Sequence, residues 1–294
     1  MNSIRKLCLG TYCTITPGSD PEFCERQYQV IYKPLVSSLY NLPQLPFSLY
    51  ISGILIDWLE RQHPEFFMIL EEMANRKQID ILGGGYYNPF FPLLPPADRV
   101  GQIELLTTSI RKHFGKRPRG AWLAASAWDP SMVSSLHTCG IEYVLLDKTM
   151  FEANGEPQIT GLSPVIMEDC GKTLVAFPLD NTLRNPEAYS PEDFLSKITS
   201  NNTETEKVQT VIVFPHQDSL PALFSQENNG VSWIEHFVSL IEESEKKVEL
   251  TTTSRVIASR NLFHRAYIST GMAPVPACRT ETGKMIRGYG QRHR

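Results

Sequence analysis

Residues 78–89 read Gln-Ile-Asp-Ile-Leu-Gly-Gly-Gly-Tyr-Tyr-Asn-Pro. The stretch Ile79–Leu82 predicts a short strand, and the three glycines that follow end it. Strand-like stretches of this kind alternate with helix-period stretches along most of the chain. Such alternation is typical of a mostly parallel sheet covered by helices, so the sequence predicts the α/β class.

The other predicted elements follow the same alternation. We predict further strands at Leu7–Tyr12, Phe47–Ile51, Gly120–Ala124, Glu142–Leu146, Thr173–Phe177, Val208–Phe214 and Val248–Leu250. We predict helices at Glu22–Leu39 with a break at Pro34, Ile54–Gln62, Pro64–Arg76, Asp98–His113, Pro130–Thr138, Pro191–Thr199 and Val231–Glu243. Seven or eight strands in roughly 255 residues fit a closed or nearly closed barrel. An open doubly wound sheet is the alternative, but Gly83–Gly85 lacks the spacing of a phosphate-binding loop.

The composition is that of an ordinary globular protein. The 294 residues are 41% hydrophobic and 20% charged, and no apolar run approaches the ~20 residues of a membrane helix. Residues 1–19 lack the pattern of a signal peptide. The six cysteines form no Cys-x-x-Cys pair and lie near no histidine at zinc spacing. We therefore expect free thiols in a cytoplasmic protein without membrane contact, and neither a metal nor a cofactor.

The charge is distributed unevenly. Residues 255–294 hold seven arginines and one lysine against Glu281, which leaves 20 basic and 31 acidic residues in the rest of the chain. A basic arm can bind nucleic acid, but this one carries no interleaved aromatic residues and no known motif. We expect no nucleic-acid partner. We predict a barrel domain over residues 1–255 and a basic tail over residues 256–294 that does not belong to it.

Aromatic and polar residues follow the predicted strands at their carboxyl ends, where barrel enzymes carry their chemistry. Aromatic rings stack on sugar rings, and polar side chains bind their hydroxyls. The candidate sugar contacts are Tyr86, Tyr87, Asn88, Trp122, Trp128, Asp147 and His216. Each has a plainer interpretation, which stays open. The tryptophans can plug the barrel, Asp147 can cap the next turn, His216 and Asp218 can form a solvated pair, and Arg184 can clamp an acid instead of a ligand.

At these residues the chain resembles glycoside hydrolase family 57, the amylases and 4-α-glucanotransferases that act on α-glucans. The resemblance covers residues from about 7 to 255, with a weaker similarity to about 271. It rests on the segments 50–60, 78–89, 122–130, 140–147 and 177–184, of which 78–89 is the most specific. The resemblance implies an incomplete (β/α)7, TIM-like barrel of parallel strands.

The chain departs from the family pattern at the positions that carry the chemistry. The family's nucleophile glutamate falls on Ala125, and the arginine after it falls on Ser126. The first strand lacks the family's histidine, and Asn88 replaces an acid. Asp218 aligns with the acid/base aspartate only if the strand end shifts by about one residue. Retaining hydrolysis needs two carboxyl groups about 5–5.5 Å apart, so no residue is predicted as catalytic and Asp218 is only a weak candidate.

Three functions remain open from the sequence. The first is a catalytically inactive family 57-like barrel with residual binding of α-glucan or maltooligosaccharide. The second is an active α-glucan hydrolase or 4-α-glucanotransferase with a displaced carboxylate pair, and the third is a protein-interaction scaffold with an unknown partner. Deacetylase chemistry lacks its Asp-plus-two-His metal set. The family continues into a helical bundle, so the resemblance implies that residues 256–294 are the remnant of a missing helical domain.

Overall fold

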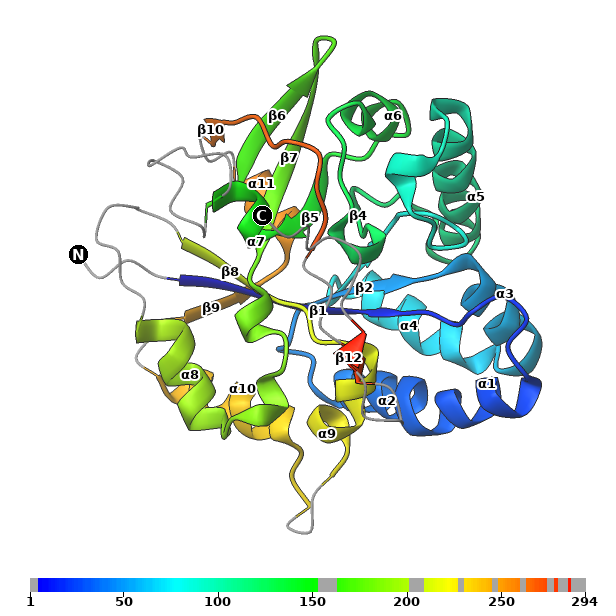
Figure 1. Ribbon diagram of the computed structural model, residues 1–294. Helices are drawn as coiled ribbons and strands as arrows, with labels where there is room; N and C mark the ends of the chain where they lie inside the picture. Colours follow the sequence, from blue (N-terminus) through cyan, green and yellow to red (C-terminus); the bar gives the residue numbers. More distant parts are fainter. Residues whose placement is uncertain are drawn as a thin grey trace.

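Parallel strands form the framework of the molecule (Figure 1). The computed structural model describes residues 5–152, 163–200, 209–226, 230–244, 248–259, 263–273, 278–279 and 285–286. One sheet has β1 (Arg5–Cys13) at its centre, with β2 (Phe47–Ile51), β3 (Ile79–Leu82), β8 (Gln209–Val213) and β9 (Val248–Thr251). All of these strands are parallel, and β8 and β9 pair with the same first half of β1 from opposite edges.

The second sheet continues the first. Its order is β10-β6-β7-β5-β4, with bounds of His264–Arg265 for β10, Val165–Asp169 for β6, Lys172–Leu179 for β7, Tyr143–Asp147 for β5 and Gly120–Ala121 for β4. A parallel bridge between Gly83 and Ala121 joins β3 to β4, and β7 packs alongside β8. The parallel strands therefore follow one another as β8-β1-β2-β3-β4-β5-β7. This arrangement confirms the predicted incomplete (β/α)7 barrel.

Helices lie around the outside of the strands (Figure 1). The α-helices are α1 (Pro21–Gln27), α2 (Lys33–Asn41), α3 (Gly53–Gln62), α4 (Glu65–Asn75), α5 (Pro96–Phe114), α6 (Met132–Thr138), α7 (Lys148–Glu152), α8 (Pro191–Ser200), α9 (Leu220–Phe224), α10 (Trp233–Glu243) and α11 (Thr253–Ala258). Short 3₁₀ turns are η2 (Phe91–Leu93), η3 (Ala124–Ser126), η4 (Asn181–Leu183), η5 (Pro186–Ala188) and η6 (Gln217–Ser219). The two-residue strands β11 (Cys278–Arg279) and β12 (Met285–Ile286) pair with each other. Within the described residues, none of the helices has the length and apolarity needed to cross a membrane.

Two local predictions were wrong. The helix expected to break at Pro34 instead continues through a π-helical turn, η1 (Tyr28–Tyr32), directly into α2, which contains Pro34. The strand expected over Gly120–Ala124 ends at Ala121. The chain then turns through Ala125 and Ser126, which both have positive φ.

The segment 263–273 packs against the second sheet. β10 extends β6, and Ile268 is buried in the cluster that also contains Trp128. Gly271 and Trp128 exchange backbone hydrogen bonds of 2.8 and 3.1 Å. Packing therefore continues beyond residue 255, the boundary expected for the barrel domain. Of the expected tail, residues 260–262, 274–277, 280–284 and 287–294 lie outside the described residues.

Candidate functional site

Three stacked aromatic rings occupy the carboxyl-terminal mouth of the barrel. Tyr12 comes from the end of β1, Trp122 directly follows β4, and Phe214 directly follows β8. Trp122 stacks on Tyr12 at a centroid distance of 4.6 Å and on Phe214 at 5.2 Å. Gly10 makes this possible, because a Cβ atom there would lie 2.1 Å from the Phe214 ring. The mouth is therefore filled with protein side chains.

Polar groups surround the Tyr12 ring. Arg184 donates a 2.9 Å hydrogen bond to the Tyr12 hydroxyl, and the His216 ring meets Tyr12 edge-on at 5.3 Å. Burial raises the pKa of Tyr12, and the Arg184 cation opposes that rise. The sequence prediction missed Tyr12, although it is the one aromatic residue in the stretch where the family's histidine is absent. Arg184, expected to clamp an acid or a ligand, holds this phenol.

His216 and Asp218 form the polar pair that the sequence allowed. The backbone N–H of Asp218 donates to His216 Nδ1 at 3.2 Å, and an Asp218 carboxylate oxygen also lies 3.2 Å from that nitrogen. The side chains are 44% and 72% exposed, so both reach solvent. Burial lowers the pKa of His216; the Asp218 carboxylate opposes this shift and the Arg184 cation adds to it. The pair combines capping of η6 with an exposed polar surface.

Ala125 occupies a strained turn at the predicted nucleophile position. Ala125 and Ser126 both lie in the left-handed region, with φ values of 53° and 48°. Such backbone costs of order 1–3 kcal/mol for a residue with a Cβ atom and often marks functional sites. The Ala125 carbonyl accepts a 2.9 Å bond from the N–H of Ala273. Ala125 is exposed, but its methyl group offers neither charge nor nucleophile.

Both tryptophans, which are candidate sugar contacts in the sequence, are buried. Trp128 is fully buried and donates from Nε1 to the Ile268 carbonyl at 3.1 Å. Trp122 is only 3% exposed because the aromatic stack covers it. Trp122 therefore plugs the mouth, as the plainer interpretation allowed, whereas Trp128 packs in the separate hydrophobic cluster that contains Ile268.

Asp147 behaves as a turn cap. Its carboxylate is buried and accepts bonds from the Thr149 N–H at 2.9 Å, from the Thr149 hydroxyl and from the Asn181 side-chain amide. These bonds stabilise the start of α7 and tie it to η4. The carboxylate is thus already engaged by the protein.

The loop after β3 lies at the rim. Tyr86 covers Gly53, and its hydroxyl donates to Asp57 at 2.5 Å. Burial raises the pKa of Tyr86, and the bond to the Asp57 carboxylate raises it further. Tyr87 is 53% exposed, while Asn88 adopts a left-handed turn with φ of 50°. Of this loop, Tyr87 presents the most open aromatic ring.

A second carboxylate near Asp218 was not predicted from the sequence. Glu187 Oε1 accepts a 2.7 Å bond from the hydroxyl of Ser219, the residue next to Asp218. Its Oε2 is buried without a hydrogen-bond partner in the described part of the chain, as are Trp122 Nε1 and Arg184 Nε. Buried polar atoms without partners are rare and indicate a place for water or a ligand. No sequence motif singles out Glu187, so only the fold reveals it.

The described ranges contain no group of three or more His, Cys, Asp or Glu residues placed to hold a metal ion. The site therefore consists of the aromatic stack, the polar groups around Tyr12, and the Ala125 turn.

Comparison with known proteins defines the class. The model of glycosyl hydrolase family 57 matches residues 11–271, so the chain belongs to this family. Alpha-amylase 1 of Dictyoglomus thermophilum is 34% identical over 224 residues, which are 75% of this chain and 32% of the relative. The 4-alpha-glucanotransferase of Thermococcus litoralis is 29% identical over 241 residues, 80% of this chain and 36% of the relative. The chain thus spans about a third of the length of these curated relatives.

Solved structures agree with this assignment. The crystal structure of the Thermococcus litoralis 4-alpha-glucanotransferase superposes with a TM-score of 0.83 and 25% identity over 92% of this chain and 43% of that chain. A putative polysaccharide deacetylase from Mycobacterium smegmatis superposes with a TM-score of 0.65 at 13% identity, which shows a shared fold alone. The barrel is therefore that of family 57, and its mouth corresponds to the end where barrel enzymes act.

Proposed function

We propose that this chain is a non-catalytic member of glycosyl hydrolase family 57 that binds α-glucan weakly at the rim of the barrel mouth. The observation that supports the proposal is Ala125, an exposed methyl group on a strained turn at the position where the sequence predicts the family's nucleophile. Retaining hydrolysis needs a carboxylate there and a second one about 5–5.5 Å away. The names of the relatives, alpha-amylase and 4-alpha-glucanotransferase, supply the class of ligand.

Only part of the set of sugar contacts predicted from the sequence lies open at the rim. Tyr87 has an open ring, and the exposed His216–Asp218 pair carries donor and acceptor atoms. Trp122, Trp128 and Asp147 are occupied by contacts within the protein. A few solvated contacts support only weak binding, roughly millimolar or about 4 kcal/mol.

The chain contains a matched control for the binding test. His236 and Glu192 form a second exposed pair, with a nitrogen–oxygen distance of 3.2 Å, on α10 and α8. Maltoheptaose is titrated into isotopically labelled protein and followed by NMR. We expect shifts at rim residues that His216→Ala abolishes and His236→Ala leaves unchanged. The absence of any saturable shift at tens of millimolar sugar supports a protein-interaction scaffold instead.

A displaced carboxylate pair is the second candidate function, and Glu187 is the observation that favours it. Its Oε1 accepts a bond from Ser219, the residue next to Asp218, and its Oε2 has no hydrogen-bond partner among the described residues. In this alternative the two carboxyl groups act together on a glycosidic bond. Release of reducing sugar that both Glu187→Gln and Asp218→Asn abolish would establish it and overturn the non-catalytic proposal.

A further inference from the structure

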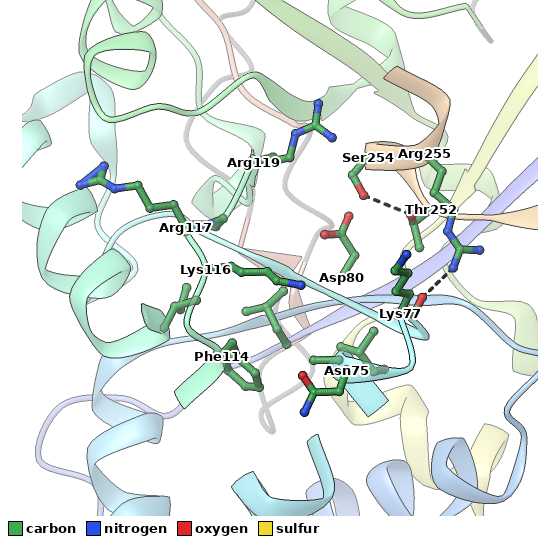
Figure 2. Close-up of a pocket in the computed structure, with 15 residues that line it drawn as sticks. Asn75, Lys77, Asp80, Phe114, Lys116, Arg117, Arg119, Thr252, Ser254 and Arg255 are labelled. Carbon is green, nitrogen blue, oxygen red and sulfur yellow. Dashed lines mark hydrogen bonds between the residues drawn. The ribbon is translucent and has the colours of Figure 1, made fainter. Parts of the chain in front are cut away.

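A second pocket lies at the amino-terminal ends of β3 and β4, away from the mouth (Figure 2). Its volume is about 360 Å³, which is within the usual range of about 300–1,000 Å³ for small-molecule sites. The walls come from the end of α4, the start of β3, the loop before β4, and the start of α11. None of its residues takes part in the candidate sugar site.

The pocket is strongly basic. Its lining contains one carboxylate, Asp80, and five basic side chains: Lys77, Lys116, Arg117, Arg119 and Arg255. Two of the basic groups are neutralised by ion pairs, Arg117 with Glu104 at 2.7 Å and Arg119 with Glu142 at 2.6 Å. This leaves three cations for a ligand.

The three remaining cations have no carboxylate partner in the described part of the chain. Figure 2 shows Lys77 and Lys116 facing the space beside Asp80. Arg255 donates a 2.6 Å bond to the Lys77 carbonyl, which fixes its guanidinium at the edge of this space. Three cations around one concavity form a site for an anion with several oxygen atoms, such as a phosphate.

One carboxylate, two hydroxyl groups and an apolar wall complete the pocket. Asp80 accepts a 2.9 Å bond from the Tyr143 hydroxyl, so its carboxylate is held in place beside the cavity. Thr252 and Ser254 add hydroxyl groups 3.2 Å apart. Ile81, Ile110 and Phe114 supply a hydrophobic surface. Inorganic phosphate would contact only the basic side chains. The carboxylate, the hydroxyl groups and the apolar wall fit a ligand that also has a carbon skeleton with hydroxyl groups.

We propose that this pocket binds a small phosphomonoester with a hydroxylated carbon skeleton, the class to which sugar phosphates belong. The phosphate contacts Lys77, Lys116 and Arg255. The carboxylate of Asp80 accepts hydrogen bonds from ligand hydroxyls, and the apolar wall packs against the carbon atoms.

Isothermal titration calorimetry of the full chain tests this, with glucose 6-phosphate, inorganic phosphate, glucose and adenosine monophosphate as separate probes. We expect saturable binding of glucose 6-phosphate, with a Kd about tenfold or more below those of the other three, that weakens as salt is added. Lys116→Gln raises this Kd about fivefold to tenfold, because it removes one charge-assisted hydrogen bond. Lys33→Gln removes the same charge from an exposed lysine outside the pocket and leaves the Kd unchanged.

A second variant tests the role of the hydroxyls. Asp80→Asn retains an oxygen for Tyr143 but removes the charge, so glucose 6-phosphate loses most of its advantage over inorganic phosphate. The proposal is overturned if glucose 6-phosphate does not bind, if inorganic phosphate or adenosine monophosphate binds as tightly, or if Lys116→Gln and Lys33→Gln behave alike. Displacement of glucose 6-phosphate by maltoheptaose also overturns it, because that result places both ligands at the mouth.

Discussion

The ring of Trp122 stacks on the ring of Tyr12, with planes 14° from parallel and centroids 4.6 Å apart. Tyr12 ends the first strand and Trp122 follows the fourth, so this contact joins opposite parts of the barrel across its mouth. The same contact explains why Trp122 is closed to a sugar. An aromatic residue expected to bind ligand instead stabilises the fold.

The stacked tryptophan predicts a large effect on stability. Trp122→Ala leaves a cavity between Tyr12 and Phe214 and should lower the free energy of unfolding by about 3–5 kcal/mol. Tyr87→Ala, at an exposed ring of the same rim, should change it by less than about 0.5 kcal/mol. Urea unfolding followed by circular dichroism measures both. Equal effects of the two substitutions contradict the buried stack.

The strained turn predicts a stabilising substitution. Glycine adopts the φ of 53° found at Ala125 without the steric cost of a Cβ atom. The greater entropy of glycine in the unfolded chain offsets part of this gain in stability. Ala125→Gly should therefore raise the free energy of unfolding by about 0.5–1 kcal/mol. Ala124→Gly, one residue earlier and outside the left-handed region, should lower it. Urea unfolding followed by circular dichroism measures both variants. A loss of stability in Ala125→Gly contradicts the left-handed conformation at Ala125.

The lowered pKa of His216 implies that the stability of the protein depends on pH. Its folded pKa lies below that of the unfolded chain, so the unfolded state binds more protons as the pH falls. The contribution of neutral His216 to the free energy of unfolding is fully present above the ordinary histidine pKa of about 6.5. It is lost as the pH falls through the lower pKa that His216 has in the folded protein. NMR titration should show the lowered pKa directly. Asp218→Asn should lower it further, because the opposing carboxylate charge is removed. Asp169→Asn, at the hairpin turn before the amino-terminal end of β7, should leave it unchanged.

Because the segment 263–273 packs against the second sheet, we expect its buried residue Ile268 to stabilise the protein. Ile268 is 2% exposed against the Trp128 cluster, whereas its neighbour Tyr267 is 65% exposed. Ile268→Ala should destabilise the protein by about 2–5 kcal/mol, and Tyr267→Ala should have little effect. Thermal unfolding of the two variants makes the comparison. If neither variant is destabilised, the barrel ends near residue 255, as the sequence led us to expect.

Hydrophobic pattern was sufficient to predict most of the barrel. Phe47–Ile51 and Ile79–Leu82 have the predicted bounds, because buried parallel strands are short apolar stretches between clear turn signals. The antiparallel strand β6 was missed, although Cys170 and Gly171 at positive φ form its hairpin turn. β10 has only two residues, too few for any periodicity.

The site was harder to predict than the fold. The sequence predicted that Trp122 lies at the end of a strand. It did not predict that Tyr12 and Phe214, each more than 90 residues away along the chain, stack on Trp122 and bury it. The role of Asp147 depended on Asn181, which a different strand positions. Glu187 became a candidate only because its second carboxylate oxygen is buried and has no hydrogen-bond partner within the part of the chain that the structure describes. Contacts between distant segments decide these roles, and local patterns do not encode them.

The central claim, absence of glycosidase chemistry, is tested most directly by reducing-sugar release and product chromatography on maltoheptaose. We expect no hydrolysis or transfer above a buffer blank for the wild-type chain. We expect the same for Ala125→Glu, because Asn88 and the first strand also lack the family's residues. Turnover by the wild-type chain that is lost in Asp218→Asn or Glu187→Gln contradicts the account and establishes an active carboxylate pair.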